Sequence, residues 1–117
     1  MIKGTGIDIV KIDRIKRAAD KWGERFLRRI FSEDELNYCS AKGNSFESLA
    51  ARFAAKEAFI KAIGARIDFK SIKIYNEPSG KPCLIIDEPL PPNLRFHLTI
   101  SHDTEYAIAM VIVEELQ

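Results

Sequence analysis

The first part of the chain contains two different hydrophobic patterns. A β-branched run over residues 4–10 predicts a strand, although its single acid, Asp8, is unusual because aspartate is depleted in strands. Apolar residues then recur near helical spacing over residues 12–30, which predicts an amphipathic helix interrupted around Gly23. The chain is therefore expected to open with a strand followed by a helix.

Two further helices are predicted, and both have sequence signals at an end. Ser32 and Glu35 have the spacing of a capping box, in which each side chain satisfies a free amide at the start of a short helix. A longer, alanine-rich helix is predicted from about Glu47 to Ile63, and Gly64 is expected to end it in the left-handed conformation. The helical part of the chain should therefore stop at residue 64.

The second half of the chain contains strand-like segments separated by turns. Residues 71–75 and 82–86, with a turn at 78–80, predict one hairpin, and residues 95–100 and 106–113 predict a second. No internal repeat or low-complexity tract interrupts this order. It predicts an α+β fold, with one domain over residues 1–117 and a mostly antiparallel sheet packed against the long helix.

Composition agrees with a single compact domain. A chain of 117 residues, 46% hydrophobic and 30% charged, has room for one core and is typical of a soluble globular protein. No apolar run approaches the roughly 20 residues of a transmembrane helix and no signal-peptide pattern is present, so we expect a cytoplasmic protein. Cys39 and Cys83 lack metal-ligand spacing and are expected to be free thiols.

Candidate chemistry lies on the long helix and on the first strand. Glu57 lies between Lys56 and Lys61 and precedes Lys61 by one helical turn. Glu57 and Lys61 either form an ordinary surface ion pair or present a carboxylate and an ammonium together to one polyanionic ligand. Asp8 needs a cation if it is buried in a strand, unless it is a turn or N-cap acid. Two carboxylates with a nearby lysine are typical of sites where Mg²⁺ is coordinated by protein carboxylates together with phosphate oxygens of a substrate.

The formal net charge of +1 conceals a basic segment. Residues 14–29 contain seven basic residues against Asp20 and Glu24, an excess of five positive charges. This pattern predicts either a solvated helix face or a surface for an acidic partner. Nucleic acid and membrane are not expected partners, since no nucleic-acid reader motif appears and aromatic residues are not interleaved with the basic ones on one face.

These residues resemble a known family. Gly6-Ile7-Asp8 together with Phe53-x-x-Lys56-Glu57-Ala58-x-x-Lys61 resembles the two signatures of the 4'-phosphopantetheinyl transferases, and the short length is similar to their holo-acyl-carrier-protein synthase branch. Other matching segments are Phe31-Ser32-x-x-Glu35-Leu36, Arg52-Phe53-Ala54-Ala55-Lys56-Glu57, Gly80-Lys81-Pro82 and Ile100-Ser101-His102. The departures are small: the segment between Tyr38 and Leu49 is compact, and the loop over residues 88–93 has no matching motif.

The resemblance implies a reaction. Such an enzyme transfers 4'-phosphopantetheine from coenzyme A to a serine hydroxyl of an acidic acyl carrier protein, releases adenosine 3',5'-bisphosphate, and supports fatty acid biosynthesis. Asp8 and Glu57 would hold Mg²⁺ and, with Lys61, form the catalytic group. Asp8, Glu57 and a water on the metal all remain candidates for the base. The resemblance also implies a homotrimer with sites shared between neighbouring subunits.

Further site residues follow from the same resemblance. The residues expected to bind coenzyme A are Arg52, Lys56, Lys61, Gly80, Lys81, Pro82, Ser101 and His102. The residues expected to bind the carrier protein are Arg14, Arg17, Arg25 and Arg28. Without the resemblance, His102 is interpreted as a histidine in a turn, and residues 80–82 as ordinary residues of a hairpin turn. His97 is interpreted as a structural or surface residue.

Two other functions use the same residues. A different Mg-dependent enzyme that acts on a phosphoanhydride, such as a small nucleotide hydrolase, would share the carboxylates and lysine but would not need the basic helix. A non-catalytic module would use the basic helix to dock on an acidic protein or membrane surface. Transfer of phosphopantetheine to a carrier protein distinguishes the family function from both.

Overall fold

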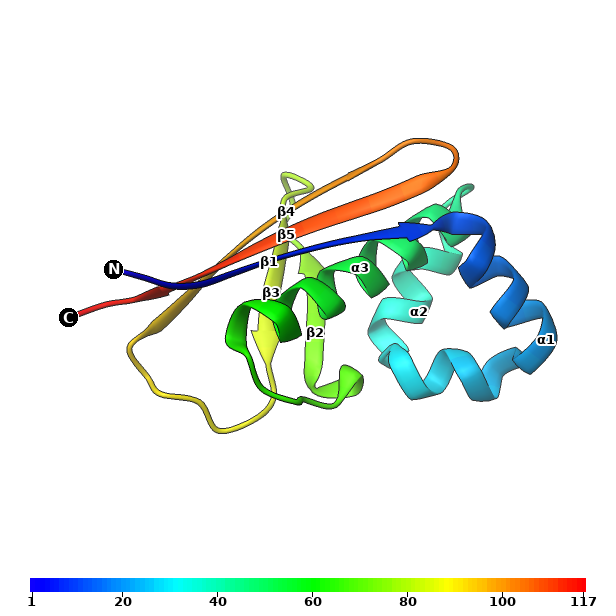
Figure 1. Cartoon of the computed structure of the whole chain (residues 1–117). Coiled ribbons are helices and arrows are strands. Elements are labelled where there is room, and N and C mark those ends of the chain that lie inside the picture. The colour runs from blue at the N-terminus through cyan, green and yellow to red at the C-terminus, as the bar shows by residue number, and fades with distance from the viewer.

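A computed structural model describes all residues, 1–117, and confirms the predicted order of strand, helices and strands (Figure 1). The elements are β1 (Ile2–Lys11), α1 (Ile12–Ile30), α2 (Glu33–Ser40), α3 (Ser45–Ile63), the 3-10 turn η1 (Phe69–Ser71), β2 (Ile72–Asn76), β3 (Pro82–Ile86), β4 (Leu94–His102) and β5 (Tyr106–Glu115). No helix combines the length and hydrophobicity that crossing a membrane requires.

The strands form two separate antiparallel sheets. The larger sheet has the order β1-β5-β4, and β2 and β3 form a hairpin of their own. In Figure 1 the larger sheet lies along one side of α3, while the β2-β3 hairpin and helices α1 and α2 lie on its other side. This arrangement confirms the predicted α+β class, in which an antiparallel sheet packs against the long helix.

Two glycines allow β1 to pass directly against α3. A Cβ atom added at Gly4 would lie 2.0 Å from the carbonyl oxygen of Ala62, and one added at Gly6 would lie 2.0 Å from that of Ala58. Side chains alternate along a strand, so Asp8 lies on the same face of β1 as Gly4 and Gly6. The close approach therefore places Asp8 against the helix, within β1 and not in a turn or at an N-cap.

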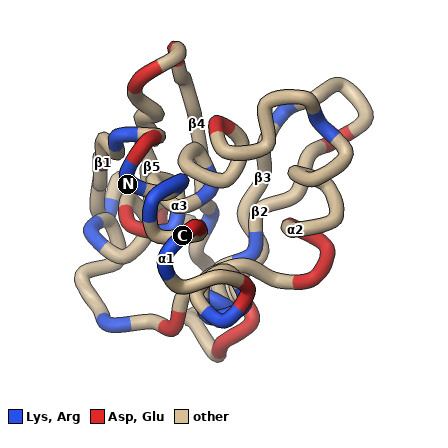
Figure 2. The backbone as a smooth tube through the Cα atoms, turned by 90° about the vertical axis from the view of Figure 1, so that its right-hand side faces the viewer, with Lys and Arg blue, Asp and Glu red and all other residues tan.

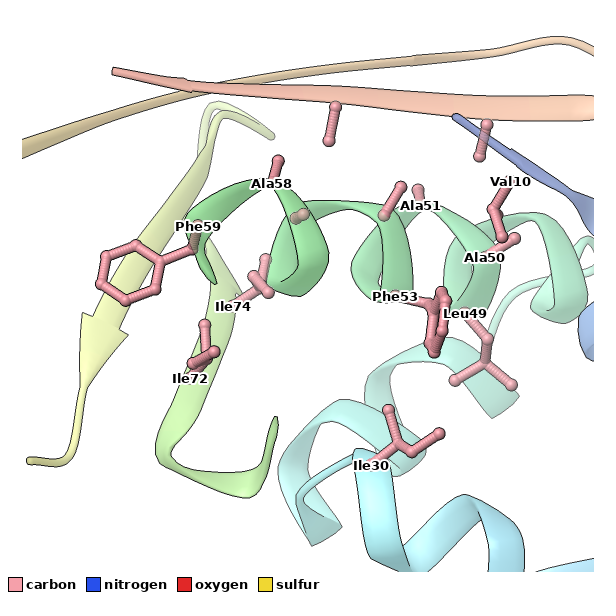
Figure 3. Packing of buried hydrophobic residues seen from close by; sticks show 14 of the residues in the cluster. Val10, Ile30, Leu49, Ala50, Ala51, Phe53, Ala58, Phe59, Ile72 and Ile74 are labelled. Atoms are coloured by element: carbon pink, nitrogen blue, oxygen red, sulfur yellow. The ribbon is translucent and has the colours of Figure 1, made fainter. Parts of the chain in front are cut away.

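The alanine-rich helix α3 is buried over most of its surface between Leu49 and Ala62, with elements packed on more than one side of it. Figure 3 shows Ala51 and Ala58 facing the sheet, and Phe53 and Leu49 pointing away from it toward Ile30. Small alanine side chains let the sheet approach closely, and larger residues fill the space on the opposite side. Consequently α3 is the element against which the remainder of the domain packs.

The predicted helix ends are confirmed with small differences in position. Gly23 has φ 66° and ψ −153°, which breaks α1 into two segments, and Gly64 ends α3 in the left-handed conformation with φ 70°. The Ser32–Glu35 capping box forms as predicted. Helix α3 starts at Ser45, two residues before the expected position, and both cysteines are free.

Candidate active site

The carboxylate of Asp8 has the cationic partner that the sequence required. Lys61 Nζ lies 3.0 Å from Asp8 Oδ1 and donates a second hydrogen bond, of 2.9 Å, to the carbonyl oxygen of Ile7. The Asp8 side chain is 17% exposed and that of Lys61 is 53% exposed. The pair therefore lies at the surface edge of the β1–α3 contact, where a ligand can reach both groups.

Glu57 lies one helical turn before Lys61, but the two residues do not form an ion pair. Lys61 bonds instead to Asp8, and the half-buried Glu57 carboxylate forms no hydrogen bond or salt bridge. The ordinary surface pair that spacing alone allowed is thus not formed. This leaves the Glu57 carboxylate free to bind a cation on the same flank of α3 as Lys61.

The donor groups on this flank fit Mg²⁺ only together with a phosphate-bearing substrate. No cluster of three or more histidine, cysteine or carboxylate side chains could hold a metal by itself. Two carboxylates, Asp8 and Glu57, are nevertheless the number that Mg²⁺ uses when phosphate oxygens and waters complete its octahedron. The ammonium of Lys61 already shows that Asp8 accepts a positive charge at this position.

A second site lies in a cavity of about 280 Å³ formed by α2, α3, the β2-β3 hairpin and β4. Four residues predicted to bind coenzyme A line this cavity: Arg52, Gly80, Pro82 and His102. Residues that the sequence reasoning missed also line it: Tyr38, Lys42, Ser48, Ala51, Asn76 and Ile100. These residues are far apart in the sequence and meet only when separate elements pack together, so no sequence pattern indicated that they would share a cavity.

The cavity holds cationic groups with incomplete pairing. The buried Arg52 guanidinium donates from Nη2 to Asn76 Oδ1 and lies 4.6 Å above the Tyr38 ring, while its Nε atom is buried without a hydrogen-bond partner. Lys42 Nζ lies 4.9 Å from the centre of the same ring, and His102 Nδ1 lies 3.6 Å from a Glu47 oxygen. Neither Arg52 nor Lys42 is paired with a carboxylate, and two such charges beside one cavity favour an anionic ligand.

Four predicted coenzyme residues do not line this cavity: Lys61, which lies beside Asp8, and Lys81, Ser101 and Lys56. Lys81 is exposed in the turn, and Ser101 alternates with Ile100 and His102 on β4, so it points to the other face of the sheet. Lys56 is fully buried, and burial lowers the pKa of its ammonium. Its three donors bond inside the protein, to Ile30, Glu35 and Phe69, so this structure presents no Lys56 donor to a ligand in the cavity.

The two sites lie on opposite flanks of α3. Arg52 and Lys61 are nine residues apart, and at about 100° per residue they point in roughly opposite directions around the helix. Asp8 belongs to β1 and His102 to β4, which are the two edges of the sheet with β5 between them. The chain therefore presents two separate candidate half-sites, which we name by the ligand expected at each: the metal flank (Asp8, Glu57 and Lys61) and the nucleotide cavity (the residues lining the hollow around Arg52).

Comparisons with known proteins identify the family of this chain. The family model of the 4'-phosphopantetheinyl transferase superfamily matches residues 4–111. The chain belongs to this superfamily. Every candidate residue from Asp8 to His102 lies within the matched range.

Relatives within the superfamily are similar over nearly the whole chain. The holo-[acyl-carrier-protein] synthase of Halothermothrix orenii is 48% identical, covering 98% of this chain and 99% of its own length. A crystal structure of the holo-(acyl-carrier-protein) synthase from Bacillus anthracis, in complex with CoA (3',5'-ADP), has a TM-score of 0.85 at 40% identity and covers 100% of this chain and 99% of its own. The Helicobacter pylori synthase, in complex with coenzyme A, has a TM-score of 0.82 at 34% identity, with 94% and 99% coverage.

The basic helix of this phosphopantetheinyl transferase has both paired and free arginines. Arg17 Nε lies 2.7 Å from Asp13, and Arg28 lies 2.7 Å from Glu33, so two of the four predicted partner residues are paired within the chain. Figure 2 views the molecule from the α1 end, where both basic and acidic positions occur. The helix therefore has less free positive charge than its sequence excess suggests.

The other two predicted partner residues have no acidic neighbour within ion-pair distance. Arg14 lies over the Phe53 ring, with 5.9 Å between the guanidinium carbon and the ring centre. Arg25 lines a surface hollow of about 360 Å³ with Trp22, Phe26 and Arg29, beside the break at Gly23. This hollow combines an exposed indole with two guanidinium groups, and its composition suits an acidic partner with an apolar side chain.

Proposed function

We propose that the chain is a holo-[acyl-carrier-protein] synthase, which transfers 4'-phosphopantetheine from coenzyme A to a serine hydroxyl of an acyl carrier protein. It would act in the cytoplasm and serve fatty acid biosynthesis. The observation that carries this proposal is the contact between the two signature segments of the family, in which Lys61 Nζ lies 3.0 Å from Asp8 Oδ1 across 53 residues. The names and bound ligands of the related proteins support the same substrates.

The chemistry requires no nucleophile from this chain. The serine hydroxyl of the carrier protein gives its proton to a base, for which Asp8, Glu57 and a water are the candidates. Its oxygen forms a new bond to the phosphorus next to pantetheine, and the bond from that phosphorus to the bridging pyrophosphate oxygen breaks. The electron pair of that bond leaves with adenosine 3',5'-bisphosphate. The chain has to position the two substrates and stabilise negative charge on the leaving group, which is the usual division of labour in phosphoryl transfer.

The metal flank supplies the electrostatic part of this catalysis. Asp8 and Glu57 would hold Mg²⁺, which when bound neutralises charge on pyrophosphate oxygens. Lys61 is half-exposed and lies beside Asp8, so its ammonium can also reach these oxygens and offset charge on the leaving phosphate. The compact ammonium suits this task because it carries its charge at one point.

The nucleotide cavity would bind the other end of coenzyme A. Arg52, Lys42 and His102 line the same hollow. These groups provide positive charge and hydrogen-bond donors for a phosphate, while the Tyr38 ring offers a surface on which a base can stack. Gly80 adopts a positive φ of 93°, which allows the tight turn between β2 and β3 beside the cavity.

The separation of the half-sites supports a homotrimer with shared active sites. Coenzyme A must meet both the metal flank and a nucleotide cavity, and these lie on opposite sides of α3 within one chain. The outer faces of β1 and β5 also carry uncovered apolar side chains, with Ile7 55%, Ile9 60% and Met110 38% exposed. Packing of copies through these faces would bury them and bring the two half-sites of different subunits together.

Mass spectrometry tests the proposed activity directly. The chain is mixed with coenzyme A, Mg²⁺ and an unmodified carrier protein, and transfer adds a phosphopantetheine group of about 340 Da to the carrier. Cleavage of coenzyme A without a change in carrier mass would instead indicate a phosphoanhydride hydrolase. Binding of the carrier without either reaction would indicate a non-catalytic module.

Light scattering tests the assembly separately. A trimer has a mass of about 40 kDa, three times the 13.3 kDa of one chain. Introducing Glu in place of Ile7 and Ile9 should yield monomers without transfer activity, because the half-sites would no longer meet. An active monomer would contradict the shared site.

A further inference from the structure

A buried polar cluster outside both half-sites joins five elements of the fold. Its centre is an ion pair between Lys56 Nζ and Glu35 Oε1, 2.8 Å apart, with side-chain exposures of 0% and 1%. Lys56 comes from α3 and Glu35 from α2. This cluster has no solvent-accessible surface for a ligand, so its role must be exerted through the elements that it connects.

The Lys56 ammonium connects α3 to the end of the basic helix. Besides Glu35, it donates to the carbonyl oxygen of Ile30 at 2.7 Å and to that of Phe69 at 3.0 Å. Ile30 is the last residue of α1, and Phe69 begins η1. All three ammonium donors are therefore used, and one of them anchors the carboxyl end of α1 directly on α3.

The Glu35 carboxylate connects the same point to the nucleotide cavity. Its Oε1 atom also accepts from Ser32 N at 2.9 Å, and its Oε2 atom accepts from Ile74 N at 3.1 Å. Ile74 lies on β2, two residues before Asn76, which accepts a hydrogen bond from Arg52 in the cavity. Helix α1, helix α3 and the hairpin that lines the cavity are thus held at one junction.

Stability alone is a weak reason for an ion pair at this place. Two charges lose their hydration on burial, and a well-packed apolar pair of similar volume is often as stable or more stable. Apolar side chains, however, do not impose direction on their neighbours. Hydrogen bonds to Ile30, Phe69 and Ile74 do, because each fixes both a distance and an angle between two elements.

We propose that Lys56 and Glu35 form a positioning pair, which holds the basic helix α1 at a fixed place relative to α3. The proposal rests on the proposed function, in which α1 binds the carrier protein. Lys56 directly precedes Glu57 in α3, so the junction links the carrier-binding helix to the metal flank over one residue. A carrier bound on α1 then presents its serine at a defined distance from that flank.

A double substitution, Lys56→Met with Glu35→Gln, tests the pair. Methionine keeps an unbranched chain without the ammonium, and the glutamine carbonyl oxygen can still accept from Ser32 or Ile74. Lys56→Met alone leaves an unpaired buried carboxylate and should unfold at a lower temperature than the double variant. The double variant should lose at least about tenfold in kcat/KM for the carrier protein, with KM for coenzyme A within about twofold.

Amide hydrogen exchange gives a readout independent of turnover. In the double variant, the last turn of α1 should exchange faster than in the unmodified chain, while β5 should exchange at the same rate. A matched control is the exposed pair of Lys73 and Asp87, 3.6 Å apart. Replacing these residues as Lys73→Met and Asp87→Asn should change neither measurement.

The outcomes separate this proposal from the proposed function. A folded double variant with an unchanged kcat/KM for the carrier would overturn the positioning role, as would an equal loss for both substrates. A double variant that does not fold even at low temperature would also overturn it, because the pair would then determine folding. Failure of the unmodified chain to transfer phosphopantetheine would instead overturn the proposed function.

Discussion

Replacing Gly6 with alanine should force β1 away from α3. The added Cβ would lie 2.0 Å from the carbonyl oxygen of Ala58 and 2.7 Å from the amide nitrogen of Ala62. Both neighbours are backbone atoms of a helix, so neither can rotate out of the way. Restoring an ordinary contact of 3.4 Å to the oxygen requires a local displacement of 1.4 Å, the difference between 3.4 and 2.0 Å.

This displacement should lower both stability and activity. Overpacking a core typically costs about 1–3 kcal/mol, and we expect about 3 kcal/mol because the clash is with backbone at two residues. For a chain of this size, each kcal/mol lowers Tm by about 4 °C, which gives a fall of about 12 °C. Asp8 is two residues further along the same strand face, so its contact with Lys61 should open and reduce transfer by about 10²-fold.

Thermal unfolding followed by circular dichroism measures the first effect, at one protein concentration because assembly raises Tm. Carrier mass spectrometry measures the second. Gly43→Ala is the matched control, since no heavy atom lies within 4 Å of its added Cβ, and its effect should stay within about 1 kcal/mol. A Gly6→Ala variant with Tm within about 2 °C of the unmodified chain and normal transfer would refute the reasoning.

Three further predictions concern the proposed site. Asp8→Ala and Glu57→Ala should each lower transfer at least about 10²-fold without unfolding the chain, and near-normal turnover at low Mg²⁺ would disprove that assignment. Lys61→Ala should lower kcat more than it raises KM for coenzyme A, and Lys61→Arg should rescue it only partly; a pure KM effect would indicate binding alone. Arg25→Glu should raise KM for the carrier more than Arg17→Glu does, because Asp13 already pairs with Arg17, and equal effects would argue against docking beside Gly23.

Several features of the fold could be predicted because they depend on a few consecutive residues. The Ser32–Glu35 capping box, the break at Gly23 and the left-handed end at Gly64 all formed as predicted. Each follows from local backbone chemistry: a side chain bonding a free amide, or a glycine adopting positive φ. The hairpins follow likewise from alternating apolar residues and turn residues between them.

The position of Asp8 relative to the long helix could be inferred only in part. The family signatures associate Asp8 with Glu57 and Lys61, but spacing along the chain paired Lys61 with Glu57. The structure instead pairs Lys61 with Asp8, because Gly4 and Gly6 bring β1 into direct contact with α3. The glycines were visible in the sequence, yet their role depended on which element packed against them.

The sequence by itself determined the elements, their order and the family, since these depend on local patterns and on short signatures. Tertiary structure decided which charged residues are available to ligands. Tertiary packing buried Lys56 with Glu35 and left the Nε atom of Arg52 without a hydrogen-bond partner. It also placed the nucleotide cavity on the opposite flank of α3 from the metal flank. The reason is physical: the exposure and partner of a side chain depend on residues that folding brings from distant parts of the chain, and a helical period alone does not say which face will be covered.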